Sequence, residues 1–396
     1  MFSSRVIITL IALALLLPAA SLAEERHEAF LTADMSDFIP WEDEEGFRPA
    51  AEIHYNRVDG LLCFFGIEYA RHSLMHPRLL ALRGWPSARA DNYYSVTVEQ
   101  PLFRPDGFSL GVSFYDRVSW NREDRHMITD AENTLLALFF REEFRNYYRR
   151  DGMTIFAHHR FSPRTFLRVE YQNDELSSLE TQQHVWTAFR RSVDWQENPP
   201  LMRGVLGGAE EYEGVLKCTV AEVSYDGTDE VTGDGWRFGL VTEFAGRSLG
   251  GDYEYRKHRV DASRLFVLSP TQTLYLRGAW GIASGSDIPS HKLFHLGGIS
   301  NLRGYDYNEF EGKNLAFFSI EYGVWVAEEL ATIYFFEGGQ AWYGTSGFDS
   351  EEMKYDIGIG FRLDAPGAGD IRIDVARPTT TEDADIKTIL RIETVF

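Results

Sequence analysis

The feature that most constrains this chain is the repeated alternation of apolar and polar side chains from about residue 47 onward. The last segment shows it clearly, with one face formed by Ile386, Thr388, Leu390, Ile392, Thr394 and Phe396. Successive side chains of a β-strand point to opposite faces, so such a segment presents one apolar face and one polar face. The segments run for roughly nine to fourteen residues, about what a tilted strand needs to cross a bilayer. A soluble sandwich also alternates, but it needs no segments of this length.

The expected fold is therefore an all-β, antiparallel transmembrane β-barrel. Candidate strands lie at 48–56, 60–70, 91–101, 107–117, 132–145, 151–161, 164–174, 214–226, 235–246, 251–268, 271–284, 312–326, 329–342, 353–364, 368–377 and 386–396. They number about sixteen, with fourteen as the alternative, and bacterial barrels of one chain close with even counts. The turn at Pro105-Asp106-Gly107 is tight where this strand order calls for a long loop, so a strand is missing or in excess before residue 150.

The first residues have the pattern of an export signal. Arg5 supplies a positive charge, Val6 to Leu17 an apolar core, and Ser21-Leu22-Ala23 the small residues that a signal peptidase requires. No other apolar run approaches the roughly 18 residues of a membrane-spanning helix. The expected organisation is a cleaved signal peptide at 1–23, a short acidic periplasmic leader at 24–46 and an outer-membrane barrel at 47–396.

Composition narrows the class of partner. The formal charge of −21 argues against nucleic acid, because phosphate binding needs clustered Lys and Arg. It suits acidic loops near lipopolysaccharide and its divalent cations, so outer-membrane lipid and lipopolysaccharide are the expected surroundings. The 14% of aromatic residues and a mean hydropathy of −0.28 fit strands with one apolar face. Cys63 and Cys218 fall in strand-like runs, and we expect them to be unpaired rather than joined as a disulfide.

Patterns that indicate an enzyme are weak, and no cofactor or metal is implied. Gly344-Thr345-Ser346-Gly347 lacks the spacing of a nucleophile elbow, and no His-Glu-x-x-His motif occurs. His158 and His159 are adjacent, so a strand points them to opposite faces, which makes them a poor ligand pair. A hydrolase that builds Ser and His across neighbouring strands leaves no linear signature, and it stays a minor alternative.

The C-terminal quarter carries an ordered set of motifs. Their order is Leu296-Gly297-Gly298-Ile299-Ser300-Asn301-Leu302-Arg303-Gly304-Tyr305, then the segments 334–342, 357–362 and 371–378, and finally Phe396 at the end of the chain. Together they resemble the C-terminal barrel of the outer-membrane assembly and surface-antigen superfamily, which includes the BamA and TamA proteins. The resemblance covers residues 293–396 well and the remainder only in pattern.

This resemblance implies that the loop around Arg303 folds back into the barrel lumen, where Arg303 meets a carboxylate, with Glu337 as the expected anion. Leu302, Gly304 and Tyr305 complete the motif, and Phe396 is the signal of the last strand. Arginine offers a planar fork of donors that matches a carboxylate, so one pair fixes both position and orientation of a long loop. The alternative is a solvated Arg303. Glu321 and Arg362 lie on predicted lumen faces, where they either extend the network or simply contact water.

The sequence also departs from the family. Gly323 follows Glu321-Tyr322 where relatives often carry Arg, and residues 24–46 are too few for the polypeptide-transport-associated domains of assembly factors. The segment Asn56-Arg57-Val58-Asp59-Gly60-Leu61 looks like the entry to the first membrane strands in barrel-only relatives; the alternative is a polar turn between two strands.

The resemblance implies a protein that is not an enzyme, resides in the outer membrane of a Gram-negative bacterium, and assists insertion or translocation of proteins or lipids. In that family the first and last barrel strands pair poorly and part for a client strand. A protein client and a periplasmic partner are the expected protein contacts. Two alternatives remain: a passive pore or structural barrel plugged by its own loop, and a soluble exported sandwich that acts as a binding module.

Overall fold

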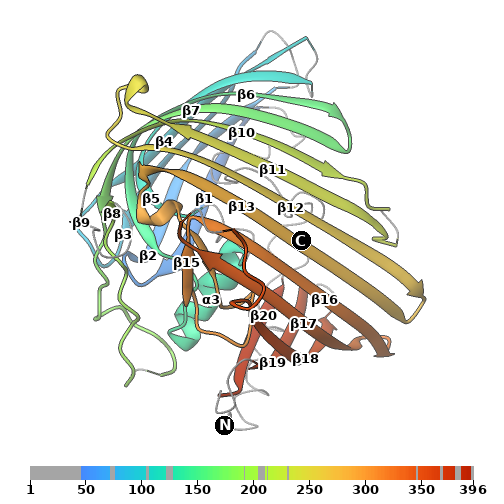
Figure 1. The fold of residues 1–396 in the computed structure, drawn as a ribbon. Helices are drawn as coiled ribbons and strands as arrows, with labels where there is room; N and C mark the ends of the chain where they lie inside the picture. The colour runs from blue at the N-terminus through green and yellow to red at the C-terminus, as the bar shows by residue number, and fades with distance from the viewer. Residues whose placement is uncertain are drawn as a thin grey trace.

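The chain forms one long antiparallel sheet in which each strand pairs with the next (Figure 1). The structure is a computed structural model, and it describes residues 46–71, 76–103, 107–121, 128–190, 192–203, 210–211, 213–229, 232–344, 347–365, 369–379 and 385–393. The sheet strands in this part are β1 (Gly46–Asn56), β2 (Gly60–Ala70), β3 (Arg78–Pro86), β4 (Tyr93–Leu102), β5 (Phe108–Trp120), β6 (Tyr147–Ser162), β7 (Thr165–Ser178), β10 (Gly214–Asp226), β11 (Gly235–Ala245), β12 (Glu254–Ser269), β13 (Gln272–Asp287), β16 (Asn314–Ala327), β17 (Leu330–Trp342), β18 (Lys354–Ala365), β19 (Gly369–Pro378) and β20 (Lys387–Glu393).

Smaller elements lie in the connections between these strands. They are the helix α3 (Asp130–Phe140), the 3-10 turns η1 (Arg247–Leu249) and η2 (Ser290–Lys292), and two short strand pairs, β8 (Met202–Arg203) with β9 (Glu210–Glu211) and β14 (Phe294–Leu296) with β15 (Phe310–Gly312). Among the described residues, no helix has the length and apolarity that crossing a bilayer requires.

The sheet buries polar side chains and exposes apolar ones. On β7, Arg168, Glu170 and Gln172 are buried, whereas Val169 between them is 39% exposed. The exposed side of other strands carries large apolar residues such as Phe65, Phe114, Ile155, Phe238, Ile282, Ile357 and Phe361. This distribution is the reverse of a soluble protein and is that of a barrel with a polar lumen and a lipid-facing exterior. The expected transmembrane barrel is confirmed, and the soluble sandwich is wrong.

The expected strand number of sixteen is correct. It is correct only because two errors offset each other: one expected strand is a helix, and one strand of the sheet was not expected. The segment 132–145, expected as a strand, overlaps the helix α3 (Asp130–Phe140). The hydroxyl of Thr129 caps this helix by accepting a hydrogen bond from the backbone N–H of Glu132 at 3.1 Å, and Thr129-Asp130-Ala131-Glu132 has the spacing of a capping box. The helix ends at Arg141, whose φ of 60° is left-handed.

The strand that the sequence reading omitted is β3. Its core Leu79-Leu80-Ala81-Leu82 lacks the β-branched residues that mark a strand, and Pro77 and Pro86 flank it. Pairing with β2 on one side and β4 on the other overrides that weak propensity. With β3 in place, the short connection between β4 and β5 and the long one between β5 and β6 lie at the ends of the barrel that the strand order requires, which resolves the conflict.

Between β5 and β17, the longest and the shortest connections lie at opposite ends of the barrel. Residues 163–164, 270–271 and 328–329 are tight turns, whereas residues 121–146, 179–213 and 288–313 connect strands at the other end of the barrel. In outer-membrane barrels the short turns face the periplasm and the long loops face outward. The long loops are the ones that carry α3 and the β14–β15 pair.

The two ends of the sheet, β1 and β20, form the seam of the barrel. Within the described residues no backbone pairing joins them. Helix α3 instead packs against both, and in Figure 1 the green helix lies close to the red strand β20. Both cysteines are free, Cys63 on β2 and Cys218 on β10, as expected.

Candidate functional site in the barrel lumen

The loop between β13 and β16 returns into the barrel. Strands β14 and β15 form its stem, and Gly297 and Gly298, with φ of 107° and 123°, turn the chain into the tip. Such angles favour glycine because it has no Cβ. Ile299 and Leu302 in the tip are fully buried, so this loop packs inside the molecule and does not extend into solvent.

Arg303, in this tip, contacts three carboxylates from three strands. Its Nη2 donates to Glu337 Oε1 on β17 at 2.9 Å and to Glu321 Oε1 on β16 at 2.6 Å, and its Nη1 donates to Asp374 Oδ2 on β19 at 2.8 Å. The backbone N–H of Arg303 donates to the second Glu337 oxygen at 3.0 Å. One guanidinium therefore ties the loop to the wall beside the seam.

The surroundings of Arg303 hold its charge. Its side chain is 4% exposed, and its guanidinium carbon lies 3.6 Å from the centre of the Phe335 ring, a cation–π contact. Burial by itself would lower the pKa of Arg303, but the charges of Glu337, Glu321 and Asp374 raise it well above its ordinary value. Arg303 is a permanent cation here.

Gly304 and Tyr305 extend the same attachment to β18. The backbone N–H of Gly304 donates to Asp356 Oδ2 at 2.7 Å, and a Cβ at Gly304 would lie only 2.9 Å from the Asp356 Cβ. This close approach requires glycine. The hydroxyl of Tyr305 donates to the Tyr355 carbonyl at 3.3 Å, and its ring packs edge-on against Phe310.

A second guanidinium, that of Arg372 on β19, completes the cluster. It donates to Glu321 Oε1 at 3.1 Å and to Asp374 Oδ1 at 2.8 Å. Gly323, where relatives often carry Arg, brings no side chain to the network. Arg362 does not reach it either, since Arg362 pairs with Asp370 on the neighbouring strand.

The structure thus brings together six of the eight residues singled out from the sequence: Leu302, Arg303, Gly304, Tyr305, Glu337 and Glu321. Arg362 lies apart, and Phe396 falls outside the described residues, as do the expected signal peptide and nearly all of the leader. Sequence reasoning missed the part played by Asp374, Asp356, Arg372 and Phe335. The functional importance of the cluster stays a prediction.

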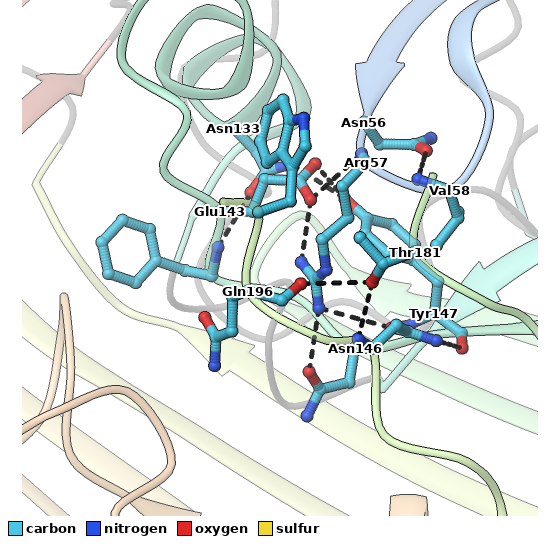
Figure 2. A network of polar contacts seen from close by, with 12 residues as sticks. Asn56, Arg57, Val58, Asn133, Glu143, Asn146, Tyr147, Thr181 and Gln196 are labelled. Atoms are coloured by element: carbon cyan, nitrogen blue, oxygen red, sulfur yellow. Dashed lines mark hydrogen bonds and ion pairs between the residues drawn. The ribbon is translucent and has the colours of Figure 1, made fainter. Parts of the chain in front are cut away.

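A second buried arginine, Arg57, was also missed as a site. It lies in the turn between β1 and β2, and Figure 2 shows its side chain among residues of two other loops. Its Nη1 donates to Glu143 Oε2 at 2.8 Å, and its Nη2 donates to Asn146 Oδ1 and Asn198 Oδ1, both at 3.3 Å. Arg57 is 0% exposed, so it fastens the first hairpin to the loops at 121–146 and 179–213.

The turn that carries Arg57 is held by its own side chains. Asn56 Oδ1 accepts the backbone N–H groups of Val58 and Asp59, at 3.0 and 2.7 Å, and Figure 2 shows the bond to Val58. Asp59 Oδ1 accepts the Tyr93 hydroxyl at 2.9 Å. The interpretation of residues 56–61 as a polar turn between strands describes this geometry, although the turn is buried. Burial raises the pKa of Glu143 even though Arg57 acts against it, and burial raises the pKa of Asp59 to about 6.

We expect the Asp59 carboxyl to make the folded barrel more stable in mild acid. Its pKa rises from 3.8 to about 6 on folding, so its contribution is fully present below pH 4 and is lost as the pH rises through 6. Between pH 5 and pH 7 the loss amounts to about 1 kcal/mol. Urea unfolding at the two pH values measures it, with Asp59→Asn as the comparison. An equal pH dependence in both proteins would contradict the assignment.

The two adjacent histidines lie in different surroundings. Among the residues that the structure describes, no group of His, Cys, Asp and Glu side chains is placed to hold a metal ion. His158 Nε2 lies 3.2 Å from buried Glu99, whereas the His159 ring packs against exposed Phe161. The adjacent histidines therefore point to opposite faces of β6, as their spacing predicts.

A sixteen-stranded sheet with a polar interior, an apolar exterior and a loop fastened in its lumen defines an outer-membrane β-barrel. The family model of the Omp85 superfamily domain matches residues 80–393, and the chain belongs to this superfamily. Its members are outer-membrane assembly and transport proteins without enzymatic activity, which confirms the family, the Gram-negative outer-membrane location and the non-enzymatic class expected from the sequence.

Individual relatives support the same family. The outer membrane protein assembly factor BamA of Nitratidesulfovibrio vulgaris (strain Hildenborough) is 30% identical over 191 residues, which cover 43% of this chain and 24% of that protein. The chain therefore spans about a quarter of the length of this curated relative. The crystal structure of BamA from Haemophilus ducreyi lacking POTRA domains 1–3 has a TM-score of 0.58 at 13% identity, covering 88% of this chain and 71% of that one, and shows the shared fold.

Proposed function

We propose that this protein assists insertion or translocation of client proteins or lipids at the outer membrane by opening its sheet between β1 and β20. The observation that carries the proposal is the seam, where no backbone pairing joins the two strands within the described residues. An unpaired strand edge accepts a further strand by backbone hydrogen bonds. The mechanism uses geometry and needs no catalytic group.

The strands next to the seam, β16 to β19, are connected to one another through the lumen loop and should stay together while the seam opens. Arg303 and Arg372 connect β16, β17 and β19 through shared carboxylates, and Gly304 adds β18. Strand β20 follows directly and pairs with β19 along seven residues, from Ala376 to Asp370. Movement is therefore concentrated at β20 and β1.

Lipopolysaccharide and a periplasmic partner protein belong to the same proposal. The net charge of −21 suits loops that contact the divalent cations bound by lipopolysaccharide. The rival function is a passive pore or structural barrel, which the burial of the loop tip around Arg303 favours. In that case the loop plugs the lumen and the seam stays shut.

A crosslink across the seam separates the two functions. The pair suggested by the sequence, Leu61 with Ile392, is unsuitable because Leu61 belongs to β2 and pairs with Tyr55 inside the first hairpin. Ile53→Cys on β1 with Ile392→Cys on β20 spans the seam, in a Cys63→Ala, Cys218→Ala background. The protein is placed in lipid vesicles, and the folding rate of an unfolded outer-membrane barrel client is measured before and after treatment with thiol crosslinkers of graded length.

The expected result is acceleration of client folding by the uncrosslinked protein and loss of that acceleration on crosslinking. The chain offers a matched control, because Ile53 lies directly opposite native Cys63 in the β1–β2 register. Ile53→Cys with Cys63 retained places the crosslink within the hairpin and leaves the seam free. Equal client folding in the seam-locked and hairpin-locked proteins would favour the structural barrel.

A further inference from the structure

Helix α3 is attached to the edge of the last strand. Glu132, which is 0% exposed, accepts the backbone N–H of Ile392 at 2.9 Å through Oε1. The same oxygen accepts Arg391 Nε at 2.9 Å, and Oε2 accepts Arg391 Nη2 at 3.4 Å. A carboxylate of the helix therefore occupies a hydrogen-bonding position on the open side of β20.

The same helix is attached to the first strand. Thr134 Oγ1 accepts the backbone N–H of Tyr55 at 3.3 Å, and the Asp130 carboxylate lies 4.0 Å from His54 Nδ1. Glu132 and Thr134 are two residues apart, and each accepts a backbone N–H from one edge of the sheet. These side chains take acceptor roles that a neighbouring strand fills elsewhere in the sheet.

Helix α3 packs against the lumen loop, both edge strands and the loop at 179–213. Leu136 and Phe140 are buried with Ile299 of the lumen loop, and Ile389 and Leu390 of β20 pack against this cluster. Ala137 is buried in a second cluster with Tyr55 of β1 and with Val185 and Trp195 of the loop at 179–213, and Leu138 packs against it. Apolar contacts therefore hold α3 in place, while its polar residues Glu132 and Thr134 accept hydrogen bonds from the two edge strands.

Arg391 links the helix to the lumen loop. Besides its bonds to Glu132, its Nη1 donates to the carbonyl of Ile299 at 3.5 Å. Ile299 precedes Arg303 by four positions in the tip. Strand β20, helix α3 and the anchored loop therefore meet at one side chain, and displacing the helix from β20 breaks contacts to Glu132 without breaking the Arg303 cluster.

We propose that α3 is a built-in stopper of the seam, which covers the β20 edge through Glu132 and which an incoming client strand must displace before it can pair there. This inference rests on the proposed function, since it names what competes with the client. Replacement of Glu132 by a client strand is favourable, because Glu132 makes one hydrogen bond to the backbone of β20, whereas an extended strand makes a ladder of such bonds. The client chemistry is a β-strand with an apolar face.

The test removes the Glu132 side chain, through which the stopper covers β20, and measures access to the β20 edge directly. Glu132→Ala is compared with Glu142→Ala, the same change in the same loop at a carboxylate that pairs with Arg190. Hydrogen exchange of the segment 387–393 is read by mass spectrometry in lipid vesicles. In parallel, a synthetic peptide with the sequence of residues 46–56 and a photoreactive group reports whether the β20 edge accepts a strand.

We expect Glu132→Ala to speed exchange in this segment by about tenfold, as loss of a buried hydrogen bond implies, and to increase peptide crosslinking to β20, while Glu142→Ala matches the unchanged protein. If Glu132→Ala does not fold, Glu132→Gln serves, because its amide oxygen still accepts the Ile392 N–H but has no charge for Arg391, so a smaller effect is expected. Unchanged exchange and crosslinking in a folded Glu132 variant would overturn the stopper.

These readouts need no client. Hydrogen exchange and peptide crosslinking that rise in Glu132→Ala, without any variant that accelerates client folding, would support the Glu132 contact at the β20 edge and contradict the proposed assembly function. If the unchanged protein accelerates client folding and Glu132→Ala alters neither edge access nor that rate, the function stands and the stopper fails.

Discussion

Replacing Arg303 by alanine is expected to lower the free energy of unfolding of the barrel by about 3 to 5 kcal/mol. The reason is that Glu337, Glu321 and Asp374 lose a shared counter-charge, and Glu337 and Asp374 have almost no access to water. The lumen loop also loses its attachment to three strands. Urea unfolding in detergent micelles measures the change, and the folded band on an unheated gel should convert at a lower temperature.

Two comparison variants sharpen this result. Arg303→Lys keeps the charge but cannot form the same fork of hydrogen bonds, so its loss should be smaller than that of alanine. Arg377→Ala removes an exposed arginine from β19 and should change stability by less than about 1 kcal/mol. Unaltered unfolding of Arg303→Ala would show that the cluster does not stabilise the barrel.

Replacing Arg57 by alanine is the second large expected effect, again a loss of about 3 to 5 kcal/mol in the free energy of unfolding, because buried Glu143 is left without its charged partner. The first hairpin should also come away from the loops that Asn146 and Asn198 belong to, which limited proteolysis of the folded barrel would detect as new cleavage at 121–146 and 179–213.

A double substitution separates the effect of the uncompensated Glu143 charge from the effect of the lost Arg57 side-chain packing. Adding Glu143→Gln to Arg57→Ala removes the uncompensated carboxylate, so the double variant should be more stable than Arg57→Ala alone. Arg190→Ala is the matched control, since Arg190 pairs with Glu142 at the surface of the same loops and should cost less than about 1 kcal/mol. A double variant that is less stable than the single one would show that the buried charge is not the cause.

The sequence predicted the fold best where alternation is clean. Strands β16 to β19 match their expected ranges closely because each has a two-residue repeat and Gly or acidic residues at its ends. Prediction failed at β3 and α3, for different reasons. The Leu and Ala residues of β3 have no strong strand propensity, and only its neighbours make it a strand. At α3, an apolar run was taken for a strand although Thr129 and Glu132 already indicated a helix start.

For the lumen cluster, the two-residue repeat predicts which face a side chain occupies but not its height in the barrel. Glu321 and Arg362 were both placed on the lumen face, yet only Glu321 lies at the level that the loop tip reaches. Asp374 and Asp356 alternate with apolar neighbours in the same way, and the stagger between strands decides that they meet the loop. The partners of Arg57 lie 86 and 141 residues away in the sequence, so no local pattern could predict that Arg57 is buried and paired.

The bond between Glu132 and Arg391 has a consequence for how the molecule is made. It spans 259 residues, joining an early loop to the final strand. The chain must exist as far as Arg391 before the bond forms, and closing so long a loop by itself is entropically unfavourable unless the intervening strands are already paired. The contact between Glu132 and Arg391 therefore forms late in folding. A chain that ends before Arg391 leaves α3 without its attachment to β20.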